Sequence, residues 1–192
     1  MNPKLIFWFN DHFPLLGLPK ILQEKYNFDV YAILDVADKH KKFFQEQKLI
    51  KFSKIWYFHD YISKTAEKPD TEYLKLIEKK YKVDLGLLAS NDRFFNKFNE
   101  FYKFSPDEIL LILEQECKLF EKILDELKPD FIIMTITNVH HDHLFYKICQ
   151  ARGVKILILW QSNLRGRYTI SSRIDLIDHA EYNEKHNFGS FS

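Results

Sequence analysis

"DFIIMTITNVHHDHLFYKICQARGVKILILW", residues 130–160, carries the clearest structural signal in this chain. It opens with a short continuous apolar run over 130–136, which is typical of a buried strand. A helical pattern follows over 141–152, Gly153 makes a turn, and a second apolar run covers 154–160. Strand, helix and strand in this order predict a βαβ unit with two parallel strands in one sheet.

The rest of the chain repeats this alternation of strands and helices. It predicts an α/β fold, a Rossmann-like and mostly parallel sheet with helices on both faces. One such domain is expected over 1–175, with a polar tail or the start of a linker over 176–192. The predicted strands cover 4–9, 28–34, 54–58 and, more weakly, 83–89, and the predicted helices cover 18–26, 39–47 and 71–81.

A further, long helix has an unusually clear start and end. In "SPDE", Ser105 can cap the helix, the proline after it suits the first helical position, and Glu108 completes a capping box. Pro129 ends the helix. The period of the apolar residues places Glu121 on the outside and one stripe toward the core. That stripe consists of Ile109, Leu113, Cys117, Phe120, Leu124 and Leu127.

The overall composition excludes several classes of protein. The 192 residues include 28 basic and 27 acidic side chains, and a formal charge of +1 argues against a nucleic-acid-binding protein. No apolar run reaches the roughly 18 residues that a membrane span needs, and no signal peptide is recognisable at the start. The cytoplasm is therefore the expected location, with peripheral membrane association still compatible. Cys117 and Cys149 lie on apolar helix faces and are expected to be inert thiols.

Polar side chains gather after the predicted strands, in the segments 10–12, 90–93, 137–143 and 161–167. Because ligands of parallel α/β sheets bind outside the carboxyl ends of the strands, these segments predict one polar cleft. The residues expected to bind substrate there are Asn10, Asn91, Asp92, Arg93, Thr137, Asn138, His143, Asn163, Arg165 and Arg167. Asp11, His12, His140 and His141 are the catalytic candidates.

The histidine cluster in this cleft allows three interpretations. His140 and His143 are spaced to share a helix face, so they could bind zinc if His12 or Asp11 supplied a third ligand. A histidine could instead act as a general base, because its ordinary pKa lies near neutral pH. The third interpretation is a polar helix start. The familiar zinc motifs HExxH and CxxC are absent, so no metal is expected, and the histidines should be exposed and dispensable for folding.

Two other features bear on ligand binding. Arg165 and Arg167 could clamp a phosphate, a carboxylate or an acidic sugar, or could be solvated loop charges. An aromatic cluster fits a packed lid or core patch better than a stacking platform, although a sugar-binding subsite also favours such rings; it comprises Phe94, Phe95, Phe98, Phe101, Tyr102 and Phe104. The chain has no dinucleotide-binding fingerprint, no P-loop and no Gly-x-Ser-x-Gly motif.

Three stretches together resemble a known group of proteins: "SNDRFFNKFNEFY", "SPDEILLILEQECKLFEKILDELKPDFIIM" and "ARGVKILIL…SNLRGRYTIS". They are similar to the N-terminal half of capsule polysaccharide biosynthesis proteins and related GT-B glycosyltransferases, over roughly residues 80–173. The order of long helix, "KPD", strand, helix, glycine and strand also resembles the first domain of UDP-N-acetylglucosamine 2-epimerases, which share the GT-B architecture.

The resemblance implies two Rossmann-like domains that face a cleft, the first binding the acceptor and the second a nucleotide-sugar donor. This sequence is expected to contain only the first domain, with no cofactor of its own. Asp11, His12, His140 or His141 would then hold or deprotonate an acceptor hydroxyl without a metal. Two alternatives remain open: a non-catalytic domain that binds a glycan or a partner, and a histidine-based metal-dependent hydrolase.

Overall fold

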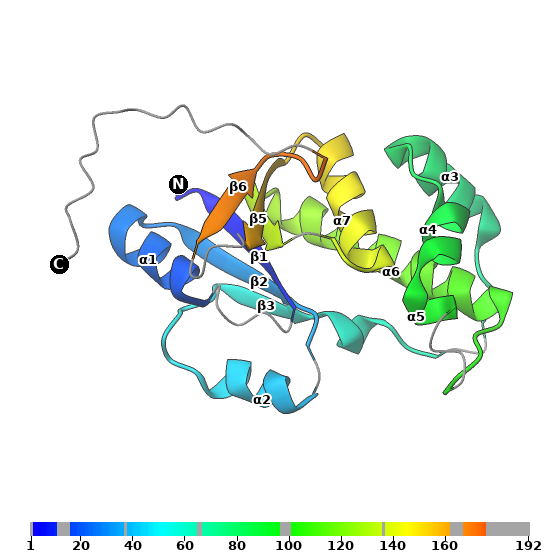
Figure 1. Ribbon diagram of the computed structural model, residues 1–192, viewed down its shortest axis with the longest axis horizontal. Helices are drawn as coiled ribbons and strands as arrows, with labels where there is room; N and C mark the ends of the chain where they lie inside the picture. The colour runs from blue at the N-terminus through cyan, green and yellow to red at the C-terminus, as the bar shows by residue number, and fades with distance from the viewer. Residues whose placement is uncertain are drawn as a thin grey trace.

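A computed structural model describes residues 2–10, 16–36, 38–64, 67–96, 101–135, 137–161 and 167–175 (Figure 1). The chain folds as an α/β protein around a six-stranded sheet, as predicted from the alternation of apolar patterns. The strand order is β3-β2-β1-β4-β5-β6. The proposed tail over 176–192 lies outside the described residues.

Five of the six strands run parallel, and β6 pairs with β5 in the antiparallel direction. The sheet is therefore mostly parallel and Rossmann-like, with each crossover made through helices. Strand β6 was not predicted, because "NLRGRY" was interpreted as a loop. The strands are β1 (Lys4–Phe9), β2 (Asp29–Leu34), β3 (Lys54–Tyr57), β4 (Phe131–Thr135), β5 (Lys155–Gln161) and β6 (Tyr168–Ser171).

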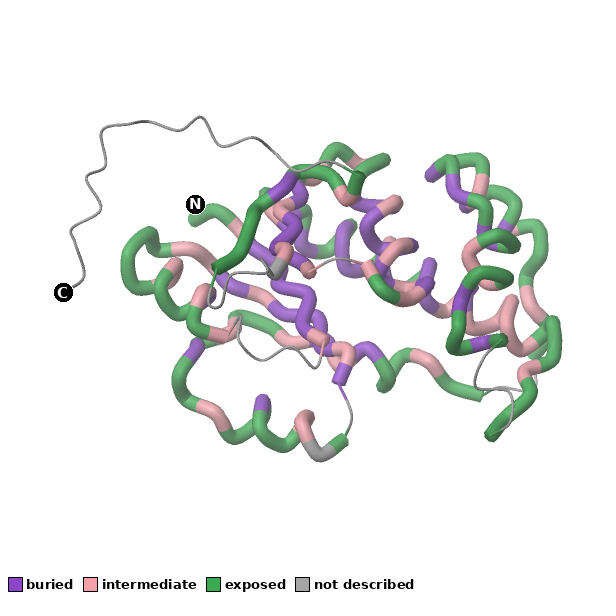
Figure 2. The backbone as a smooth tube through the Cα atoms, in the orientation of Figure 1, coloured by how far each residue is buried: buried purple, intermediate pink, exposed green. Residues whose placement is uncertain are grey.

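Helices cover both faces of the sheet (Figures 1 and 2). Helices α1 (Gly17–Tyr26) and α2 (Asp38–Glu46) cover one face, and α6 (Pro106–Leu127) and α7 (His140–Ala151) cover the other. Outside α6 and α7 lie α3 (Thr71–Tyr81), α4 (Leu85–Asn91) and the short α5 (Arg93–Asn96). A 3-10 turn, η2 (Phe58–Tyr61), follows β3.

The two faces of the sheet build separate apolar cores. In β1, Leu5 and Phe7 join the core under α1 and α2, whereas Ile6 and Trp8 join the larger core under α6 and α7. This division follows from the alternation of side chains along a strand. Because both faces are covered, β1 is apolar and buried at every position after Lys4, which explains the continuous run "LIFWF".

The prediction of a strand over 83–89 is wrong, since this segment forms α4. Asp84 caps the helix, and its side chain accepts a hydrogen bond from the backbone N–H of Leu87. Only Leu85 is buried, while Leu87 is exposed. A helix of seven residues is too short to display a helical period, so the apolar run was mistaken for a strand.

The long helix α6 confirms the expected capping. Ser105 and Glu108 form a reciprocal capping box, and the helix ends at Leu127, two residues before Pro129. Its predicted apolar stripe is buried, apart from the half-buried Ile109. Glu121 departs from the expectation, because it is largely buried beside two tyrosines instead of lying outside.

Both cysteines are buried, as expected. Among the described residues, no helix has the length and apolar character needed to cross a membrane.

Candidate functional site

The carboxyl ends of β1, β2 and β4 meet at one edge of the sheet. Asn10 follows β1, and its side-chain amide donates a hydrogen bond to the hydroxyl of Thr135 at the end of β4, over 3.3 Å. Asp35 follows β2 and lies 2.9 Å from Nε2 of His141, in the first turn of α7. The expectation that the segments around Asn10 and His140 share one end of the sheet is therefore confirmed.

The segment 90–93 reaches the same edge by a different route. It follows helix α4, whereas the sequence pattern predicts that it follows a strand. Asp92 nevertheless contacts His140, and a polar cavity of about 290 Å³ lies between this segment and the start of α7. Its lining includes Asn91, Asp92, Arg93, Thr137, Asn138, His140 and His143.

His140 is clamped between two carboxylates. Its Nδ1 lies 2.9 Å from Oδ2 of Asp92, and its Nε2 lies 2.9 Å from Oε1 of Glu116 on α6. Burial by itself lowers the pKa of His140, but the charge of Glu116 and the hydrogen bonds to both carboxylates raise it to about 9. The residue is only 5% exposed. The expectation that His140 faces solvent is therefore wrong.

His141 has a carboxylate partner of its own. Oδ2 of Asp35 lies 2.9 Å from Nε2 of His141, and the other oxygen of Asp35 lies 3.0 Å from Nε2 of His59. Burial lowers the pKa of His141, but the hydrogen bond to Asp35 and the charges of the nearby carboxylates together outweigh burial and raise it. Burial raises the pKa of Asp35, and its hydrogen bonds to both histidines hold it well below the ordinary range. His141 is largely buried, against the expectation, with its ring packed on Phe58 at 4.7 Å between centroids.

Two buried carboxylate oxygens next to these histidines make no hydrogen bond within the described part of the chain, although one of them lies 3.9 Å from Nε2 of His141. Among the described residues, no group hydrogen-bonds to Oε2 of Glu116 or to Oδ1 of Asp142, although both atoms are buried. The other oxygen of Asp142 accepts a hydrogen bond from the backbone N–H of Asn138. Burial raises the pKa of the Asp142 carboxyl. Unpaired buried oxygens are costly, so they mark this cluster as a place where a ligand would be stabilising.

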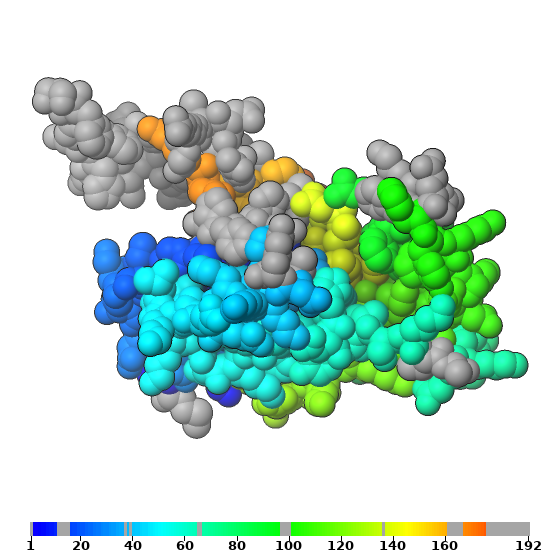
Figure 3. Space-filling view, turned by 90° about the horizontal axis from the view of Figure 1, so that it is seen from below, coloured from blue at the N-terminus to red at the C-terminus, as the bar shows by residue number. Residues whose placement is uncertain are grey.

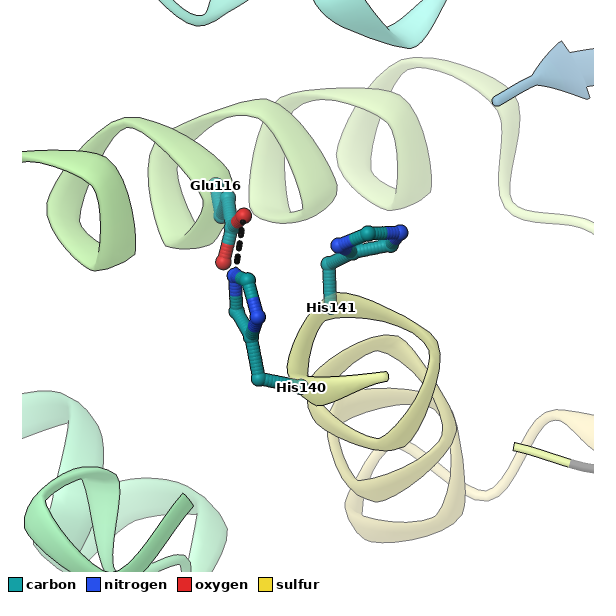
Figure 4. A group of neighbouring side chains, drawn as sticks. All are labelled: Glu116, His140 and His141. Carbon is teal, nitrogen blue, oxygen red and sulfur yellow. Dashed lines mark hydrogen bonds and ion pairs between the residues drawn. The ribbon is translucent and has the colours of Figure 1, made fainter. Parts of the chain in front are cut away.

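Two groups of side chains in this cluster could hold a metal ion. Glu116, His140 and His141 offer one ligand atom each, and these atoms lie within 4.8 Å of one another. Figure 4 shows Glu116 of α6 and His140 of α7 pointing toward each other, with the His141 ring beside them and one of its nitrogens on their side. Asp35, His141 and Asp142 form the second group, within the same distance.

A cavity of about 330 Å³ opens above the first of these groups. In the space-filling view, the yellow surface of α7 lies between the blue and cyan surface around α2 and the green surface around α4 and α5 (Figure 3). Glu116, His140 and His141 line the cavity together with residues from η2, α5 and the start of α6. The aromatic side chains in its wall are Phe58, Phe94, Tyr102 and Phe104.

The aromatic cluster thus serves two purposes. Phe95 is buried and packs against the His140 ring at 4.5 Å between centroids, as expected of a core patch. Phe94 and Tyr102 are partly exposed and line the cavity. Phe101 is 89% exposed and is not among the cavity-lining residues, and Phe98 lies outside the described residues.

Lys64, Tyr102 and Glu108 form a hydrogen-bonded group, here called the clasp, along one side of this cavity. Lys64 Nζ lies 2.9 Å from Oε1 of Glu108 and donates to the Tyr102 hydroxyl over 2.7 Å, and that hydroxyl donates to Glu108. The backbone N–H of Ser105, the Tyr102 hydroxyl and the Lys64 ammonium lower the pKa of Glu108 to about 2. The clasp links the segment after η2 with the start of α6.

Because of the clasp, we expect the pKa of the Glu108 carboxyl to lie below that of an ordinary glutamate. Because the folded-state pKa is depressed, its contribution to stability is fully present above pH 4.5 and is lost as the pH falls toward 2. An NMR titration of the side-chain carboxyl should therefore give a pKa near 2 in the wild type. The variant Tyr102→Phe should raise that value, since it removes one donor. Titration of the wild-type carboxyl near 4.5 would show that the clasp does not form.

The remaining predicted residues divide into two groups. Asp11, His12, Asn163 and Arg165 lie outside the described residues, so their roles stay predictions. Arg167 is exposed next to β6 and is absent from the lining of the two cavities above. His143 lies 3.5 Å from the Thr137 hydroxyl, and burial lowers its pKa.

Sequence reasoning missed three residues of the cluster: Asp35, His59 and Glu116. Asp35 and His59 follow predicted strands, so the rule that selected the other segments would also have selected them. Glu116 lies within the apolar side of α6, between Leu113 and Phe120. A carboxylate in such a position was the available signal, since an acidic residue is rarely fully buried without a partner.

In comparisons with known protein-family models and with curated proteins, the sequence matches none.

Proposed function

We propose that this chain is the acceptor-side domain of a GT-B-type glycosyltransferase in the assembly of surface, capsule-type polysaccharide. The observation that carries the proposal is the aromatic-walled cavity at the carboxyl edge of the sheet, with histidines and carboxylates at its floor. Aromatic rings suit the apolar faces of sugars, and the floor offers groups that can accept a proton from a hydroxyl. The resemblance in sequence over roughly 80–173 supports the same class of protein.

The cavity would hold the acceptor sugar, with Phe94 and Tyr102 stacking on it. His141 would accept the proton of the attacking hydroxyl, because Asp35 binds one ring nitrogen and leaves the other for the substrate. Asp35 would then stabilise the charged imidazolium ring. Asp92 and Glu116 would hold the His140 ring in place by their hydrogen bonds to its two nitrogens.

A second domain would supply the nucleotide-sugar donor, as the resemblance implies. Such an enzyme is expected in the cytoplasm, where it could associate peripherally with a membrane. The chain needs no cofactor of its own in this scheme. The alternative is a binding domain that uses the same cavity to hold a glycan without chemistry.

The proposal predicts that the chain binds oligosaccharides in the aromatic cavity. Phe94→Ala should weaken binding of surface-polysaccharide fragments about tenfold, equivalent to about 1.4 kcal/mol, because a stacking face is lost. Isothermal titration calorimetry measures the change. Phe101→Ala is the matched control, since Phe101 comes from the same aromatic segment but is 89% exposed and is not among the cavity-lining residues.

Equal affinities of the two variants, or no binding of any fragment, would contradict an acceptor site in this cavity. His141→Asn separates transfer from binding, because it should retain the glycan but abolish its glycosylation in the enzyme with its donor domain. Glycan binding without any transfer from nucleotide sugars would favour the binding-domain alternative.

A further inference from the structure

Three side chains at the cavity floor have the composition of a transition-metal site. Glu116 contributes a carboxylate from α6, and His140 and His141 contribute imidazoles from the first turn of α7. Two imidazoles and one carboxylate form the protein ligands of many catalytic zinc and iron sites, which keep further positions open for water or substrate. One potential ligand atom of each residue lies within 4.8 Å of the other two.

The outer nitrogens of both histidines are already held by carboxylates. Asp92 binds Nδ1 of His140 and Asp35 binds Nε2 of His141, each over 2.9 Å. Carboxylates in this position fix the tautomer and the ring orientation of metal-binding histidines. They leave Nε2 of His140 and Nδ1 of His141 for the metal. Figure 4 shows both rings with a nitrogen on the side of Glu116.

The unpaired oxygen of Glu116 is an independent indication of a ligand. The residue is 1% exposed, and its Oε2 has no hydrogen-bond partner among the described residues. An ionised, buried carboxylate with one unsatisfied oxygen is unfavourable unless a cation or a donor reaches it. A metal ion between α6 and α7 would satisfy this oxygen.

We propose that Glu116, His140 and His141 bind one divalent transition-metal ion, with zinc as the first candidate, at the floor of the aromatic cavity. A tetrahedral zinc ion with bonds of about 2.0–2.2 Å holds its ligand atoms about 3.3–3.6 Å apart. The three side chains therefore need movements on the order of 1 Å, which rotations about side-chain bonds can provide. The open coordination position faces the cavity, because all three residues line it.

This inference goes beyond the proposed function and does not depend on the identity of the substrate. A bound metal would take over from His141 the activation of a hydroxyl or a water in the cavity, by lowering its pKa. It would thereby distinguish the protein from metal-free glycosyltransferases and bring it closer to the alternative of a metal-dependent hydrolase. A chain that binds no metal could still bind glycans in the cavity. A chain that binds no glycan could still bind the metal, so the two tests can fail separately.

The test is direct metal binding by the full, untagged chain after treatment with chelator. We expect one Zn²⁺ or Co²⁺ per chain by calorimetry and elemental analysis, and the visible spectrum of Co²⁺ in a site of low symmetry. Glu116→Gln should weaken binding about 100-fold, and Asp92→Asn, which changes the partner of the outer nitrogen of His140 but no metal ligand, about 10- to 100-fold. Circular dichroism would establish that each variant is folded.

Glu114→Gln is the matched control, because Glu114 is also a buried glutamate of α6 but is bound to the backbone N–H of Asp70 and to Lys118. It should bind the metal as the wild type does. Failure of the wild type to bind Zn²⁺, Co²⁺ or Fe²⁺ would overturn the proposal. It would also be overturned if Asp142→Asn abolished binding while Glu116→Gln did not, because the ion would then occupy the second group of ligands.

Discussion

Replacing His140 with alanine should lower the free energy of unfolding by about 3–5 kcal/mol, the usual cost of breaking a buried ion pair. The imidazole lies between two buried carboxylates, at 2.9 Å from each. Asp92 would retain the backbone N–H groups of Phe94 and His140 as donors. Glu116 would lose its hydrogen bond to Nε2 of His140 and remain in the interior as an uncompensated charge, so most of the destabilisation should come from this residue.

Urea unfolding in the presence of chelator measures this effect without a contribution from bound metal. His143→Ala in the same helix should cost about 1 kcal/mol or less, since His143 is half-buried and its side chain makes a long hydrogen bond with Thr137 and a loose ring contact with Tyr146. Adding Glu116→Gln to His140→Ala should recover part of the loss, because it removes the unpaired charge. A loss below about 1 kcal/mol for His140→Ala would mean that the ion pair is solvated in solution.

This expectation reverses the one drawn from the sequence, and the difference has a physical cause. The sequence places His140 and His141 correctly after β4, at the start of a helix. It does not reveal that α4, α5 and α6 cover that helix start, because those contacts join residues 24 to 48 positions apart. Polar residues after a strand were therefore assumed to face solvent, whereas here they face one another.

The fold was more predictable than the site. Continuous apolar runs identified β1, β2, β4 and β5, and the capping box of Ser105 located the start of α6. These signals are local, since they depend on neighbouring residues. Local signals were insufficient for α4, which is short, and for β6, whose residues Tyr168–Ile170 are exposed at the sheet edge and lack an apolar pattern.

The position of the site was predictable, but its composition was not. The ends of parallel strands correctly indicated the edge that holds Asn10 beside Thr135 and Thr137 beside the histidines. Glu116 belongs to the middle of a helix, and no rule about strand ends could select it. Its recognition requires knowing which face of α6 meets α7, and this depends on packing between elements.

Phe120→Ala should lower the free energy of unfolding by about 3–5 kcal/mol, as is typical of truncating a large core side chain. Phe120 is 0% exposed on the face of α6 that covers the sheet. Its ring contacts those of Trp8, Phe58 and Phe145, at 5.8, 6.1 and 4.9 Å between centroids. Removing the ring would leave a cavity among these rigid side chains, which can collapse only in part.

The Phe120→Ala substitution should also affect His141 at the cavity floor. Trp8 and Phe58 pack on the His141 ring as well as on Phe120, so a cavity at Phe120 loosens the support of His141. We therefore expect Phe120→Ala to weaken ligand binding at the cavity floor even where the variant remains folded. Phe101→Ala, at a position 89% exposed, should change stability by no more than about 0.5 kcal/mol. Similar urea midpoints for the two variants would show that α6 does not pack on the sheet through Phe120.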